Sequence, residues 1–229
     1  MVDMPSLICS ITRPAALRGP ARAGVSSGAA LALALLATGC NSTDKDAAGA
    51  QPSASVAGTE HVCSSCHGTG GKSTLSSTFP RLAGQQDEYL VTQLKAFRDK
   101  SRADPHAHTY MWGMAARLTD PTIDGLAAYY AAQPPVHGSP GDPAEIATGK
   151  KIFDEGIPAE SVPACAACHG EQAQGAGAIP RLAGQHRSYL ERQLDAFSSN
   201  ARANEIMHEN SKNLTAQQIS QVAAFLSAQ

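Results

Sequence analysis

An internal repeat limits what this chain can fold into more than any other feature of its sequence. Residues 80–97 read PRLAGQQDEYLVTQLKAF and residues 180–197 read PRLAGQHRSYLERQLDAF, with twelve of the eighteen positions identical. Repetition on this scale indicates that one structural unit occurs twice. We therefore predict two domains of the same fold within the 229 residues of the chain.

A Cys-x-x-Cys-His motif precedes each copy of the repeat, and this motif is typical of c-type haem attachment. Two thiols three positions apart can form thioethers with one haem, and the following imidazole can bind its iron. The residues expected to attach and ligate two haems are Cys63, Cys66, His67, Cys165, Cys168 and His169. A structural zinc site is the alternative, but its cysteines and histidines are usually further apart. The sequence therefore predicts two covalently bound haem c groups.

Helical periodicity continues after each repeat, and no alternating strand pattern occurs along the chain. Leu118 and Thr119 correspond to Leu214 and Thr215, and each threonine is a candidate N-cap. The apolar positions at helical spacing are Ile123, Leu126, Ala127 and Tyr130 in the first unit, and Ile219, Val222, Ala223 and Leu226 in the second. Aromatic residues make up only 5% of the chain, which suits small helical units whose cores a haem completes. We predict an all-α fold.

Domain boundaries follow from composition. The first domain is expected over residues 56–134 and the second over residues 144–229, because the Pro- and Gly-rich segment 135–143 has the composition of a linker. Residues 144–153 are expected to form the opening helix of the second domain. The first domain has a shorter equivalent, over residues 56–61.

The N-terminus has the pattern of an export signal. Basic residues precede the apolar run 29–37, which is too short to span a bilayer comfortably. The run ends in a segment that resembles a bacterial lipobox, so residues 1–40 are expected to be a signal peptide and Cys40 a lipidated residue. Ordinary cleavage near residues 48–50 is the alternative. Residues 41–55 are small and polar, as in a flexible tether.

The repeat also selects candidate ligands for the sixth position of each iron. Met111 stands seven residues before Leu118, and Met207 stands seven residues before Leu214. Methionine at this position suits an electron carrier. We therefore expect His67 with Met111, and His169 with Met207, as the axial pairs. Met114 has no methionine counterpart and is predicted to fill the core. The rival ligands, expected at the surface instead, are His106, His108 and His208.

Residues next to the haems can also be proposed. A proximal histidine usually donates its second ring N–H to a carbonyl, and those of Pro80 and Pro180 are candidates. Arg81 and Arg181 either pair with haem propionates or are solvated residues at a turn. These two alternatives remain open at this point.

Taken together, these residues resemble the di-haem cytochrome c4 family over residues 56–229. The resemblance rests on CSSCHG and CAACHG, on the two PRLAGQ segments, and on MWGMAARLTD and IMHENSKNLT. It implies two tandem class I cytochrome c domains, each wrapped around one haem with His/Met ligation. It also implies haem attachment outside the cytoplasm and periplasmic electron transfer, from a quinol–cytochrome c oxidoreductase toward a haem–copper terminal oxidase. A lipid anchor is not a general feature of this family.

Three other functions are compatible with parts of the pattern. A cytochrome subunit of a periplasmic dehydrogenase would share this domain type. A di-haem peroxidase would need an open axial position, which the matched methionines argue against. A small-ligand sensor would need an output domain. The formal net charge of −2 gives no indication of nucleic-acid binding. We therefore expect an electron carrier with redox-protein partners, held at a membrane in the periplasm by the lipid on Cys40.

Overall fold

A computed structural model describes residues 49–229, all of which lie within one compact unit, Asp44–Gln229. The predicted signal peptide, Cys40 and most of the predicted tether lie outside the described residues. Over residues 49–229 the secondary structure is helical, with two isolated β-bridges, Ile157–Val162 and Ala176–Ile179. The prediction of an all-α fold is confirmed. No helix in this range is both long and apolar enough to span a membrane.

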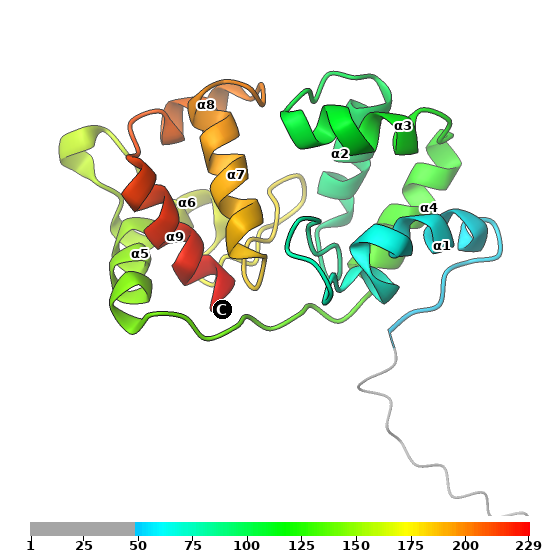
Figure 1. Ribbon diagram of the computed structural model, residues 1–229, viewed down its shortest axis with the longest axis horizontal. Coiled ribbons are helices and arrows are strands. Elements are labelled where there is room, and N and C mark those ends of the chain that lie inside the picture. The colour runs from blue at the N-terminus through cyan, green and yellow to red at the C-terminus, as the bar shows by residue number, and fades with distance from the viewer. Residues whose placement is uncertain (1–48) are drawn as a thin grey trace, which may run out of the picture. The chain divides into compact units, whose positions relative to one another are not determined.

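Four α-helices and two irregular helical turns form the first domain (Figure 1). They are α1 (Ala57–His67), η1 (Thr69–Gly71), α2 (Asp87–Arg98), η2 (Ala107–Met111), α3 (Trp112–Ala115) and α4 (Asp120–Ala131). Helix α2 packs against α4, and Val56 is buried against Gly125 of α4. The opening helix is longer than the predicted segment 56–61, because it continues through the first Cys-x-x-Cys-His motif.

The second domain repeats this plan with a separate opening helix. Its elements are α5 (Pro143–Glu155), η3 (Pro158–Glu160), α6 (Ala166–His169), α7 (Arg187–Ser198), α8 (Glu205–Ser211) and α9 (Ala216–Ser227). Helix α9 packs against both α5 and α7. Gly149 allows the contact with α5, since a Cβ at this position would overlap the carbonyl of Gln221 on α9. The opening helix predicted over residues 144–153 is confirmed.

The predicted core and helix caps are present in both domains. All eight apolar residues expected on the buried faces of α4 and α9 are buried. The Thr119 hydroxyl accepts a hydrogen bond from the backbone N–H of Thr122, and the Thr215 hydroxyl accepts one from that of Gln218. The Gln218 side chain returns a hydrogen bond to the Thr215 N–H, which completes a capping box. Both helices therefore begin where the sequence predicts.

The linker between the domains is held along its length. Figure 1 shows it running between α4 and α5. Gly138 N–H donates to the carbonyl of Gln229 at 2.6 Å, and Ser139 N–H donates to that of Ser227 at 3.1 Å. Asp142 then caps α5 by accepting from two backbone N–H groups. The linker thus packs against the end of α9 before the second domain begins.

The PRLAGQ segments of the two domains bind each other through reciprocal hydrogen bonds. The Gln185 side chain accepts from the Arg81 N–H and donates to the Arg81 carbonyl, both at 2.9 Å. The Gln85 side chain makes the same pair of bonds with the Arg181 backbone, at 2.7 and 2.9 Å. Both glutamines are buried. The arrangement is self-complementary, as in a twofold-symmetric interface, which gives a structural reason for the strong repetition of this segment.

Candidate haem sites

The first Cys-x-x-Cys-His motif lies on the last turns of α1. Cys63 is half-buried, Cys66 is exposed and His67 is only 7% exposed. The helix ends at Gly68, whose positive φ of 73° favours glycine. The next segment then turns back, and Ser73 N–H donates to the carbonyl of His67. The end of α1 therefore holds the imidazole inside and leaves one thiol half-buried and one exposed.

The second motif is built on a shorter helix with the same outcome. Cys165 precedes α6 and is half-buried, Cys168 is exposed, and His169 is 7% exposed. Gly170, with φ of 80°, ends this helix as Gly68 ends α1. The two motifs thus present their thiols and imidazoles with matching burial, although the helices leading to them differ.

Both proximal histidines have one ring nitrogen committed to a carbonyl. His67 Nδ1 lies 2.9 Å from the Pro80 oxygen, and His169 Nδ1 lies 3.1 Å from the Pro180 oxygen. A carbonyl can only accept, so Nδ1 carries the proton and Nε2 keeps the lone pair that an iron requires. Burial also lowers the pKa of each ring below its usual value, although the carbonyl partly opposes this effect. Each imidazole is therefore neutral and oriented as a metal ligand.

The half-buried thiols are protonated at neutral pH before any haem is attached. Burial raises the pKa of Cys63, and it raises the pKa of Cys165 to about 11. A zinc site would instead need deprotonated thiolates that converge with a histidine on one point. Among residues 49–229, no three His, Cys, Asp or Glu side chains are placed to hold one metal ion. The local geometry suits two separate thioether bonds better than a zinc tetrahedron.

The predicted axial methionines lie in equivalent segments of the two domains. Met111 is the last residue of η2 and packs, half-buried, against Phe97, Ala107 and Ala115. Met207 is half-buried in α8, and its N–H donates to the side chain of Asn204 at 2.9 Å. Their role as iron ligands stays a prediction.

The prediction that Met114 fills the core is wrong. Its side chain is 58% exposed, because the inward position of α3 belongs to the neighbouring Ala115, which is fully buried. Gly113 likewise needs no special conformation, since a Cβ there would meet nothing within 4 Å. Glu209 stands at the equivalent position of the second domain, two residues after Met207, so the missing glycine there removes no conformation that the first domain requires.

The rival histidines have other contacts. His106 packs against Tyr110, and His108 packs against Trp112 with ring centroids 4.6 Å apart. His208 Nδ1 donates to the Phe197 carbonyl at 2.9 Å. Trp112, at the equivalent position of the first domain, donates its indole N–H to the Arg102 carbonyl at 2.8 Å. His208 thus ties its segment to the end of α7, and Trp112 ties its segment to the loop that follows α2.

Each site has one buried arginine nitrogen that a haem could satisfy. Arg81 Nε and Arg181 Nε are buried without a hydrogen-bond partner, and each follows the proline that holds a proximal histidine. A buried orphan donor is costly unless a ligand satisfies it, and a haem propionate is an acceptor suited to arginine. Arg81 is also bound to the backbone of Gly184 through its Nη1, so it is not a freely solvated residue. The residues present fit one haem in each domain.

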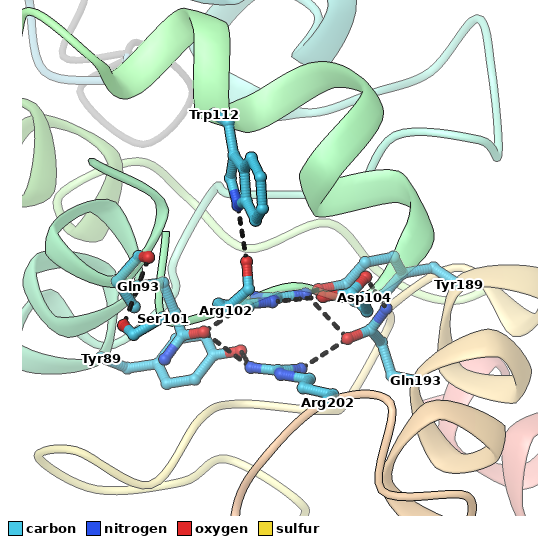
Figure 2. A network of polar contacts seen from close by, with 10 residues as sticks. Tyr89, Gln93, Ser101, Arg102, Asp104, Trp112, Tyr189, Gln193 and Arg202 are labelled. Atoms are coloured by element: carbon cyan, nitrogen blue, oxygen red, sulfur yellow. Dashed lines mark hydrogen bonds and ion pairs between the residues drawn. The ribbon is translucent and has the colours of Figure 1, made fainter. Parts of the chain in front are cut away.

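Sequence reasoning missed a buried polar network at the domain junction. Figure 2 shows the guanidinium groups of Arg102 and Arg202 beside each other, surrounded by polar side chains from both domains. The surrounding partners are Tyr89, Gln93, Asp104, Tyr189 and Gln193. The sequence leaves open whether Tyr89, Gln93 and their repeat mates line haem or only pack. In the structure they bind the two arginines. The available signal was the shared Arg-Ala pair at 102–103 and 202–203.

The family model described as cytochrome c matches this chain twice, over residues 54–131 and 146–229. Cytochrome c-552 of Acidithiobacillus ferridurans is 46% identical over 167 residues, which cover 72% of this chain and 73% of that protein. Cytochrome c4 of Thiocapsa roseopersicina is 39% identical over 182 residues, which cover 76% and 91% of the two chains.

A third relative and two solved structures are also similar to this chain. The thiosulfate dehydrogenase electron acceptor of Thiomonas intermedia is 35% identical over 174 residues, covering 73% of this chain and 78% of that protein. The structure of Acidithiobacillus ferrooxidans cytochrome c4 superposes with a TM-score of 0.71 at 44% identity, covering 74% of this chain and 99% of that one. Thiosulfate dehydrogenase from Marichromatium purpuratum gives 0.64 at 34% identity, covering 72% of this chain and 36% of that one.

Proposed function

Because the chain belongs to the cytochrome c4 family, with one cytochrome c domain in each half, we propose that it carries single electrons between respiratory-chain proteins in the periplasm, toward a terminal oxidase. The family relationship makes it a di-haem electron-transfer cytochrome with two covalently bound haem c groups. One observation supports the role of electron carrier. Two buried, neutral histidines are oriented in the same way, and each domain offers a methionine at the equivalent position.

The chain's own residues define what each site can do. A bound haem supplies one-electron chemistry at its iron. His67 and His169 provide proximal ligands whose orientation is fixed by Pro80 and Pro180. A methionine on the opposite side would close the sixth position to water and peroxide. Closed sites support electron transfer and disfavour peroxidase chemistry, so purified holoprotein should not turn over hydrogen peroxide; sustained turnover would contradict the proposal.

Export and anchoring belong to the same proposal, and the signal-like N-terminus and the haem motifs support them. Cys40→Ser should move the holoprotein from the membrane fraction of the producing bacterium to the soluble periplasmic fraction, because the lipid-bearing thiol is lost. Cys9→Ser changes a thiol within the predicted signal and should leave the distribution unchanged. If the Cys40 variant stays with the membrane, something other than a lipid on Cys40 holds it there, and if the unchanged protein is already in the soluble fraction, the proposed anchor is absent.

A second candidate function is to accept electrons from a periplasmic dehydrogenase. It is favoured by the relative named as an electron acceptor of thiosulfate dehydrogenase and by the structural similarity to a thiosulfate dehydrogenase. In such a pathway the cytochrome would receive electrons from the dehydrogenase rather than from a quinol–cytochrome c oxidoreductase.

Stopped-flow mixing separates these donors and tests the acceptor. Oxidised holoprotein would be mixed with a thiosulfate dehydrogenase plus thiosulfate, and separately with a quinol–cytochrome c oxidoreductase plus quinol. The faster haem reduction identifies the favoured donor. Reduced holoprotein should then be reoxidised faster by membranes that contain a haem–copper oxidase than by membranes lacking one. Equal reoxidation by both membranes would contradict the direction of transfer that we propose.

A further inference from the structure

The arginine network at the domain junction is nearly twofold symmetric. Arg102 lies over the ring of Phe97 at 4.7 Å, and Arg202 lies over that of Phe197 at 4.5 Å. Each guanidinium also reaches the other domain. Arg102 donates to Gln193 Oε1 at 2.7 Å, and Arg202 donates to Gln93 Oε1 at 2.7 Å. Both arginines are buried, so their charges are weakly screened by solvent.

A single carboxylate breaks this symmetry. Asp104 Oδ2 accepts from Arg102 Nε at 2.9 Å, and Asp104 is only 2% exposed. Burial opposes its charge, but Arg102 holds the pKa of this carboxyl below its usual range. Asn204 occupies the equivalent position of the second domain, where it is exposed and caps α8. Among the described residues, Arg102 therefore forms a direct ion pair with a carboxylate of its own domain and Arg202 forms none, although the Asp104 charge also acts on Arg202.

The network also contacts the wall of each predicted methionine site. In the first domain, Phe97 belongs to the same apolar cluster as Met111. In the second, the Phe197 carbonyl accepts from His208, the residue next to Met207. Arg102 thus lies one aromatic ring away from Met111, whereas Arg202 is connected to the Met207 segment through Phe197 and its backbone carbonyl. A difference in charge between the two halves of the network should therefore act unequally on the two irons.

We infer that Asp104 is a positioning residue that sets the reduction potential of the first-domain haem below that of the second. A buried negative charge stabilises the ferric iron relative to the ferrous iron, and an uncompensated positive charge does the opposite. Electrons would then move from the first domain to the second when both haems are loaded. The inference rests on the proposed function, because it requires two haems with closed, equivalent ligation.

The test compares two substitutions that remove one negative charge from the same domain. Asp104→Asn removes the buried carboxylate but keeps an oxygen that can accept from Arg102. Asp99→Asn is the matched control, because Asp99 is 61% exposed and its charge is screened. Potentiometric titration of each holoprotein, followed by haem absorbance, gives the two midpoint potentials. Asp104→Asn should raise the lower midpoint and narrow the separation, whereas Asp99→Asn should leave both near their wild-type values.

A second variant keeps the buried charge. Asp104→Glu retains a carboxylate at this position and should preserve the separation of the two midpoints, so the inference stays testable if Asp104→Asn fails to fold. Unchanged separation in Asp104→Asn, a narrowed separation in Asp104→Glu, or a shift of the higher midpoint by Asp104→Asn would overturn it. Haem content and the far-red methionine band are recorded on the same samples. If the wild-type protein lacks bound haem or the far-red methionine band, the proposed function is refuted rather than this inference.

Discussion

The reciprocal glutamine bonds at the domain junction allow a quantitative prediction for Gln185→Ala. This side chain accepts from the N–H of Arg81 and donates to its carbonyl, and it also accepts from the N–H of His186. All three bonds lie at a buried position. At about 1 kcal/mol for each hydrogen bond, their loss should lower the free energy of unfolding by about 3 kcal/mol. For a protein of this size, that corresponds to a fall in Tm of about 6–12 °C.

The assay is thermal and guanidinium unfolding of the holoprotein, followed by helical circular dichroism and by haem absorbance. Gln217→Ala is the matched control, because Gln217 is exposed on α9 and its replacement by alanine should change stability by less than about 0.5 kcal/mol. A loss below about 1 kcal/mol for Gln185→Ala would refute the reasoning, since it would mean that water replaces these bonds at no cost.

Two further predictions concern the axial ligand and the pH response. Met111→Ala should open one iron and lower one midpoint potential, whereas Met114→Leu, at an exposed position, should leave both midpoint potentials unchanged. Potentiometric titration measures both values. If both midpoint potentials of Met111→Ala equal those of the unchanged protein, the assignment of Met111 as a ligand is refuted. His186 Nε2 donates to the Ser73 carbonyl at 2.8 Å, and burial and nearby arginines lower its pKa. Its neutral form therefore stabilises the fold above about pH 6.5, and this contribution is lost as pH falls further. His186→Gln should reduce the acid-induced loss of unfolding free energy, and an unchanged pH profile would contradict this.

Much of the fold follows from local sequence patterns. The helix that begins after Thr119 and the one that begins after Thr215 were predictable because a capping side chain and a 3.6-residue apolar period lie within one short segment. The hydrogen bonds from His67 and His169 to prolines were also foreseeable, because a proximal histidine usually needs such a partner. These features depend on residues close in sequence or on chemistry that the motif itself requires.

Features that depend on the contact between domains could not be predicted in this way. PRLAGQ is compatible with a simple turn into a helix, and its role at the junction depends on a partner about one hundred residues away. The position of Asp104 is a similar case. An Asp in one copy and an Asn in the other reads as a minor difference until the structure shows that one is buried beside an arginine and the other is exposed.

Local insertions limited the remaining predictions. Met111 stands seven positions after Asp104, but Met207 stands only three positions after Asn204. The four extra residues of the first domain contribute to η2, a turn that periodicity does not reveal. In α3, which follows η2, Met114 is exposed and Ala115 is buried, so the core assignment for Met114 failed.

The central claim is that both irons are closed by methionine, so the protein carries electrons rather than catalysing a reaction. The most direct test is the far-red absorption spectrum of the purified, oxidised holoprotein, where a weak sulfur-to-iron charge-transfer band requires bound methionine. We predict a band with the intensity of two haems and no high-spin signal. A missing or half-strength band would show that at least one iron is open or bound by histidine, and would contradict the account.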